Sequence, residues 1–148
     1  MATLLKVLNN RADIKSAGGV ALRVRTQADG RPLILLLHGF PELAYSWRKV
    51  MTPLAGAGYY VVAPDQRGYG LTTGWDDRFN GDLQSFTISR IAIDAFALVR
   101  ALGMKAVHTV VGHDFGSPIA AWCGLTRPDF FRSCVMMSAP YRLSLIHI

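Results

Sequence analysis

The stretch that most constrains this chain runs from Ala106 to Ser117, with the sequence AVHTVVGHDFGS. Its first part, Val107–Val111, is rich in β-branched residues, which is typical of a buried strand. The strand ends in a tight turn with Asp114 at its centre and Gly112 and Gly116 around it, and a helical pattern follows at once. Glycines in these places let a strand and a helix approach closely. The order of strand, tight turn and helix predicts a strained turn that presents Asp114 at the carboxyl end of the strand.

The residue at the centre of this turn carries a carboxylate rather than a hydroxyl. A serine there would favour acyl transfer, whereas a carboxylate nucleophile favours alkyl transfer onto its own oxygen. The alternative is that Asp114 only caps the helix that follows, because Asp is a favoured N-cap residue. A short motif does not decide between these two interpretations, so the rest of the chain has to.

Apolar strands and amphipathic helices alternate along the rest of the sequence. Continuous apolar runs predict strands buried on both faces, and the alternation in Val20–Thr26 predicts a half-buried strand at the sheet edge. The other predicted strands are Pro32–Leu37, Tyr59–Ala63, Val107–Val111 and Ser133–Ser138, and the predicted helices are Ser46–Leu54, Phe86–Leu102 and Pro118–Leu125. This order predicts an α/β fold with a mostly parallel sheet and helices on both faces.

Three loops follow predicted strands directly. They are His38–Glu42, Asp65–Gly70 and Gly112–Ser117. Because ligands bind at the carboxyl ends of the strands in such sheets, we expect the three loops to form one composite site.

The motifs in these loops resemble a known family. HGFPELAYSWR (His38–Arg48), DQRGYG (Asp65–Gly70) and GHDFGS (Gly112–Ser117) are similar in order and spacing to the α/β-hydrolase fold, and most similar to soluble epoxide hydrolases. The resemblance extends from about Val20 to Ser138 and covers the N-terminal half of that fold. It implies that Asp114 attacks an epoxide carbon, opens the ring and forms a covalent ester, which water then hydrolyses to a diol.

The resemblance also implies roles for the residues around Asp114. The backbone N–H groups of Phe40 and Phe115 would form the oxyanion hole of the second step, and the Phe40–Pro41 bond would be cis. Both donors are backbone groups, so the Phe40 and Phe115 side chains are left to line an apolar pocket. Trp47 is a further lining candidate, with a place in the core as the alternative. The residues interpreted as structural are His38, Gly39, Pro41, Gly112 and Gly116, and Asp65 and Arg67 are expected to brace their loop through hydrogen bonds and an ion pair.

Two other functions remain open at this point. Haloalkane and haloacid dehalogenases use the same Asp, but haloalkane dehalogenases usually carry Trp after the nucleophile to hold the halide, and Phe115 has no such N–H. Fluoroacetate dehalogenases carry arginines just beyond the nucleophile, and this chain has none there. The third possibility is a non-catalytic, hydrolase-like binding protein, against which the glycine-flanked Asp114 argues.

The family's general-base histidine, its acid partner and its lid tyrosines are not identified in this sequence. His108 lies at the start of the predicted strand before Asp114, His113 adjoins Asp114, and His147 lies near the C-terminus. None of the three is expected to act as the base. We therefore expect a truncated, inactive fragment in which residues 1–142 are part of a catalytic domain. The codons CTG TCT CTT ATA CAC ATC would encode Leu143–Ile148 and match a transposase adapter of sequencing libraries, so residues 143–148 are interpreted as an artefact.

Composition narrows the remaining possibilities. The formal net charge is +6, but the basic residues are scattered, so no nucleic-acid partner is expected. Cys123 and Cys134 have neither metal nor redox spacing and are expected to be buried thiols, and neither a metal nor a cofactor is expected. The longest apolar run, Leu33–Leu37, is too short to span a membrane, so a soluble, cytoplasmic protein acting on a small apolar epoxide and water is the expectation.

Overall fold

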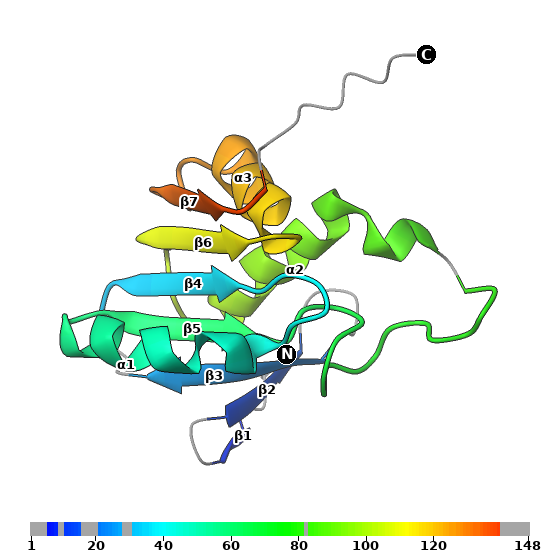
Figure 1. Ribbon diagram of the computed structural model, residues 1–148, viewed down its shortest axis with the longest axis horizontal. Helices are drawn as coiled ribbons and strands as arrows, with labels where there is room; N and C mark the ends of the chain where they lie inside the picture. Colours follow the sequence, from blue (N-terminus) through cyan, green and yellow to red (C-terminus); the bar gives the residue numbers. More distant parts are fainter. Residues whose placement is uncertain (1–5, 9–10, 16–20, 28–30, 82, 140–148) are drawn as a thin grey trace.

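The computed structural model describes residues 6–8, 11–15, 21–27, 31–81 and 83–139. Over these residues the chain forms one seven-stranded sheet in the order β1-β2-β3-β5-β4-β6-β7, flanked by helices (Figure 1). The strands are β1 (Lys6–Leu8), β2 (Arg11–Lys15), β3 (Ala21–Gln27), β4 (Leu33–Leu37), β5 (Tyr60–Pro64), β6 (Thr109–His113) and β7 (Cys134–Met137). The α-helices are α1 (Arg48–Gly56), α2 (Ile88–Ala101) and α3 (Gly116–Thr126), with short 3-10 turns η1 (Ala44–Trp47) and η2 (Leu83–Phe86).

The half of the sheet that carries the predicted site is parallel. Strands β5, β4, β6 and β7 pair in parallel, and every residue of β4 and β5 is buried. Side chains alternate across a strand, so Leu33, Leu35 and Leu37 pack with α2 and α3, while Ile34 and Leu36 pack on the opposite face with Met51 of α1. The predicted α/β architecture, with helices on both faces, is confirmed.

The other half of the sheet is antiparallel and differs from the prediction. Strand β3 pairs with β5 on one side and with β2 on the other, and β1 extends the sheet beyond β2. The expectation that Val20–Thr26 forms the edge strand is therefore wrong, because two further strands lie outside it. β1 has only three residues and β2 only five, which is too short for periodicity to distinguish a strand.

The last described strand also corrects the sequence analysis. Strand β7 was expected to be buried, but all four of its residues are exposed, including Cys134, which was expected to be a buried thiol. Its position explains this: β7 pairs with β6 alone, and no other described strand lies beside it (Figure 1). Cys123, in α3, is buried as predicted. The predicted domain boundary at residue 142 and the tail 143–148 lie outside the described residues.

Candidate active site

The turn between β6 and α3 has the strained geometry that its sequence predicts. Asp114 has φ of 50°, in the left-handed region that non-glycine residues seldom adopt. A β-carbon added at Gly112 would lie 2.1 Å from the carbonyl oxygen of Gly116, and one added at Gly116 would lie 2.3 Å from that of Leu37. Glycine is therefore required at both positions for α3 to start so close to the ends of β6 and β4.

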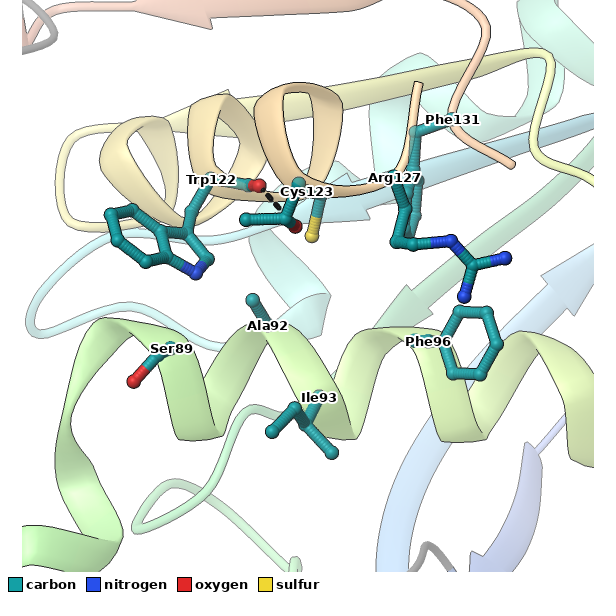
Figure 2. Close-up of a pocket in the computed structure, with 9 residues that line it drawn as sticks. Ser89, Ala92, Ile93, Phe96, Trp122, Cys123, Arg127 and Phe131 are labelled. Atoms are coloured by element: carbon teal, nitrogen blue, oxygen red, sulfur yellow. Dashed lines mark hydrogen bonds between the residues drawn. The ribbon is translucent and has the colours of Figure 1, made fainter. Parts of the chain in front are cut away.

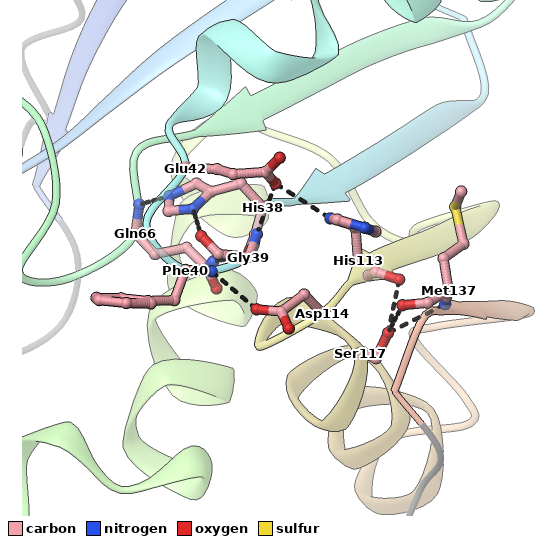
Figure 3. A network of polar contacts seen from close by, with 10 residues as sticks. His38, Gly39, Phe40, Glu42, Gln66, His113, Asp114, Ser117 and Met137 are labelled. Carbon is pink, nitrogen blue, oxygen red and sulfur yellow. Dashed lines mark hydrogen bonds and ion pairs between the residues drawn. The ribbon is translucent and has the colours of Figure 1, made fainter.

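A backbone amide from another loop binds the Asp114 carboxylate. The N–H of Phe40 donates to Oδ1 over 2.9 Å (Figure 3). The backbone N–H of Phe40 first, and then that of Phe115, hold the pKa of Asp114 below its ordinary value. The N–H of Phe40, which the resemblance places beside Asp114, thus stabilises negative charge on the carboxylate.

The loop that carries Phe40 lies directly against the turn that carries Asp114. A β-carbon at Gly39 would approach the Asp114 β-carbon to 2.6 Å, so glycine is needed there too. The Phe40–Pro41 bond is cis, as expected. Phe40 is 70% exposed, whereas Phe115 is half-buried and packs against the core.

His38 is fully buried behind this loop and holds it to the Asp65–Gly70 loop. The backbone N–H of Gln66 donates to Nε2 over 3.0 Å, and Nδ1 lies 2.9 Å from the Gly39 carbonyl oxygen. Because Nε2 accepts and a carbonyl cannot donate, the proton resides on Nδ1 and the ring is neutral. Burial lowers the pKa of His38, which fits a neutral ring. The side-chain amide of Gln66 adds a bond to the His38 carbonyl oxygen over 2.6 Å.

A second histidine, His113, forms a polar contact that was not predicted from the sequence. Its Nδ1 lies 3.1 Å from Oε2 of Glu42, and the same oxygen accepts the N–H of Gly39 over 3.3 Å (Figure 3). Glu42 therefore connects the residue before Asp114 with the residue before Phe40. The two side chains are 71 positions apart in sequence, so no local pattern indicated the pair.

The loop residues Asp65 and Arg67 do brace the site, but with different partners. Asp65 accepts the N–H of Ala44 over 2.8 Å and so holds the start of η1. Arg67 forms a two-bond ion pair with Asp94 of α2, each bond 2.8 Å long. The sequence analysis expected an ion pair here without identifying Asp94 as the partner.

Two residues considered in the sequence analysis lie apart from Asp114. Trp47 is buried in the core with Ile34 and Val61, so its packing supports the core alternative rather than a place in the substrate pocket. His108, which was not expected to act as the base, hydrogen-bonds to Thr109 at the amino end of β6 and packs at a tilt against Tyr59. Neither contributes a polar atom to the carboxylate.

The structure also contains an apolar groove outside the three loops. It has a volume of about 300 Å³ and lies between α2 and α3, with Trp122, Phe96 and Cys123 among its lining residues (Figure 2). Burial raises the pKa of Cys123 to about 12, so the thiol in this groove stays protonated. None of the lining residues belongs to the loops around Asp114.

Neither metal-binding nor membrane-spanning features were found in the described part of the chain. No group of three or more His, Cys, Asp or Glu side chains there is arranged to hold a metal ion. None of its helices combines the length and apolarity needed to cross a membrane.

The fold and the site together define an α/β protein in which a strained turn after β6 presents a carboxylate to the backbone amide of Phe40. The sequence model described as the alpha/beta hydrolase fold matches residues 32–147. The chain therefore belongs to the alpha/beta hydrolase fold family.

Several relatives within this family carry a functional name. The chain is 36% identical to an epoxide hydrolase of Caballeronia sordidicola, over 85% of this chain and 36% of that protein. It is 38% identical to epoxide hydrolase A of Mycobacterium tuberculosis, over 82% of this chain and 36% of that protein. An AB hydrolase superfamily protein of Bacillus subtilis, YfhM, is 38% identical over 85% of this chain and 42% of its own length.

Solved structures show the same similarity. The epoxide hydrolase VrEH1 of Vigna radiata superimposes with a TM-score of 0.83 at 33% identity, covering 97% of this chain and 43% of that one. A mutant of the potato epoxide hydrolase StEH1 gives a TM-score of 0.83 at 36% identity, covering 98% and 43%. The chain thus spans about two fifths of the length of the relatives it matches.

Proposed function

We propose that the protein to which this chain belongs hydrolyses epoxides to diols through a covalent ester on Asp114. The observation that carries the proposal is the Asp114 carboxylate, presented on a left-handed turn and held by the amide of Phe40. A helix cap needs neither feature, because a cap residue normally has extended backbone. The names of the relatives, several of them epoxide hydrolases, support the choice of substrate class.

The first step is an attack on the epoxide by the ionised carboxylate. One carboxylate oxygen bonds to an epoxide carbon, the ring C–O bond breaks, and the released oxygen takes up a proton from solvent water to become a hydroxyl. The lowered pKa of Asp114 keeps the nucleophile charged at neutral pH. The oxygen held by Phe40 becomes the carbonyl oxygen of the resulting ester.

The second step is hydrolysis of this ester by water. Water adds to the ester carbonyl carbon, and the negative charge that develops on the carbonyl oxygen is stabilised by the N–H groups of Phe40 and Phe115. Breaking the bond between that carbon and the ester oxygen releases the diol and restores Asp114. Both ring nitrogens of His38 are hydrogen-bonded, and His108 lies at the amino end of β6, away from Asp114. The His113 ring is turned toward Glu42 and has no hydrogen bond to the Asp114 carboxylate (Figure 3). We therefore expect the ester to persist in this chain.

This expectation makes the ester directly observable. The full 148-residue chain is incubated with styrene oxide and analysed by intact-mass and peptide mass spectrometry. We expect one added epoxide per chain, located on Asp114. The Asp114→Asn variant should give none, because the amide is not a nucleophile, and Asn tolerates the left-handed backbone.

A matched control is Asp77→Asn, which changes an exposed aspartate in the loop after β5. It should react like the unsubstituted chain. Equal labelling of the unsubstituted and Asp114→Asn chains would refute the proposal. Halide release from a haloalkane, without any adduct from the epoxide, would instead favour dehalogenation.

A further inference from the structure

Ser117, the second residue of α3, has a fully buried hydroxyl close to the nucleophile turn. Its Oγ lies 2.8 Å from the carbonyl oxygen of Gly112 and 2.8 Å from that of Met137, and the Met137 N–H donates to it over 3.0 Å (Figure 3). A hydroxyl has one proton and two lone pairs, so it accepts this N–H while donating to the two carbonyls in turn or jointly. One side chain of α3 therefore binds both β6 and β7.

The same residues hold the backbone of Asp114. The Asp114 N–H donates to the Met137 carbonyl oxygen over 2.9 Å, and the Asp114 carbonyl accepts the N–H of Ser117 over 2.9 Å. Both backbone polar groups of the nucleophile position are thus bonded either to Ser117 or to the residue that Ser117 holds.

This support is needed because neither neighbour is held by burial. Met137 is the last residue of β7, which is an edge strand of the described sheet, and it is 43% exposed. Asp114 has a left-handed conformation that costs on the order of 1–3 kcal/mol and persists only where its surroundings enforce it. The Ser117 hydroxyl is the side-chain group that fixes the end of β7 against the turn.

We propose that Ser117 is a positioning residue for Asp114. Its hydroxyl holds the Met137 carbonyl where that carbonyl accepts the Asp114 N–H, and this keeps the Asp114 carboxylate on the amide of Phe40. This inference rests on the proposed function, because the placement of Asp114 matters for catalysis only if Asp114 is the nucleophile.

Ser133 provides a matched control at the opposite end of the same two strands. Its Oγ donates to the His108 carbonyl oxygen over 2.6 Å and lies 2.8 Å from Oγ1 of Thr109. Ser133→Ala therefore removes side-chain hydrogen bonds between the segments that carry β6 and β7, at the end remote from Asp114.

The test uses the full chain in three forms: unsubstituted, Ser117→Ala and Ser133→Ala. The pKa of Asp114 is measured from its carboxyl carbon resonance, and the rate of ester formation with styrene oxide is followed by mass spectrometry. In Ser117→Ala we expect the pKa of Asp114 to rise toward its ordinary value and the rate to fall about tenfold or more, since small misplacements of reacting groups cost up to roughly a hundredfold. Ser133→Ala should leave both values unchanged, even if it lowers the free energy of unfolding.

Unchanged values in Ser117→Ala would overturn the positioning role. If that variant does not fold, Ser117→Cys replaces it: the thiol is a weaker donor and acceptor, so a smaller rise in the Asp114 pKa is expected, and no rise overturns the proposal. If the unsubstituted chain forms no ester while Ser117→Ala still raises the pKa, the proposed function fails and the positioning role stands.

Discussion

Replacing Gly116 by alanine is expected to push the start of α3 away from the end of β4. A β-carbon at this position would lie 2.3 Å from the Leu37 carbonyl oxygen and 2.8 Å from that of His38, whereas ordinary contacts lie at 3.4–4 Å. The approach is therefore about 1 Å too close, and both obstacles are backbone atoms that cannot rotate aside. Overpacking costs about 1–3 kcal/mol, and we expect the upper end here because backbone must move. Alanine regains at most about 1 kcal/mol through its helix propensity, which leaves a net loss of about 2 kcal/mol.

The assay is urea unfolding followed by circular dichroism, with Gly56→Ala as the matched control. Gly56 is the last residue of α1, and a β-carbon there would meet nothing within 4 Å. The same chemical change should therefore stabilise the chain by up to about 1 kcal/mol at Gly56 and destabilise it at Gly116. Ester formation with styrene oxide should also slow in Gly116→Ala alone, because the shifted backbone at His38 leads directly to Phe40.

Equal unfolding midpoints for Gly116→Ala and the unsubstituted chain would refute this reasoning. So would a gain in stability of the kind expected for Gly56→Ala. Either result would mean that α3 does not start in close contact with the end of β4.

Three further predictions address other parts of the structure. Asp94→Ala removes the ion-pair partner of Arg67, whose side chain is only 11% exposed. Urea unfolding should therefore show a free energy of unfolding lower by about 3–5 kcal/mol. A decrease of less than about 1 kcal/mol would contradict a buried ion pair. Gly124→Cys places a β-carbon 3.5 Å from that of Cys134, so oxidation should form a disulfide that mass spectrometry detects. The same variant with Cys134→Ser is the control and should form none. Absence of the disulfide in Gly124→Cys would contradict the packing of α3 on β7. The lowered pKa of Asp114 predicts that ester formation declines at acid pH with a midpoint below the ordinary Asp value of 3.8, and a midpoint at or above that value would contradict the hydrogen bond from Phe40.

The lowered pKa of Asp114 also makes the stability of the fold depend on pH. A carboxyl group whose pKa is lower in the folded chain than in the unfolded chain stabilises the fold fully above the unfolded value. The contribution of Asp114 is therefore present at neutral pH and is lost as the pH falls through its lowered folded value.

Apolar runs, helical spacing and glycine positions in the sequence predicted the buried strands, the packed face of α2 and the Asp114 turn. The apolar runs of β4 and β5 and the spacing of Ile91, Ala95 and Leu98 in α2 match their burial, because periodicity records which face meets the core. The glycines around Asp114 predicted the turn, because two backbone segments can approach so closely only where no β-carbon lies between them. Burial of β7 was predicted wrongly, since exposure depends on which strands lie beside it rather than on its own apolar residues.

The polar contacts around the site were harder to predict. Arg67 bonds to Asp94, 27 positions away in the sequence, and His113 contacts Glu42, 71 positions away. Such pairs arise when the fold brings distant loops together, and neither residue carries a local signal of its partner. The placement of Phe40 against Asp114, 74 positions apart, was expected only because a family resemblance supplied it.

The start of α3 gives the Asp114 carboxylate a second role, as the counter-charge of a helix. No acidic residue occupies the first turn of α3, and no side chain caps it, so the positive end of its dipole faces the turn that carries Asp114. A carboxylate at a helix N-terminus is stabilised by about 0.3–1 kcal/mol relative to a neutral group. In the proposed reaction the ester removes this charge and hydrolysis restores it. The helix therefore favours the free enzyme over the covalent intermediate, and adds a small thermodynamic bias toward completion of each turnover.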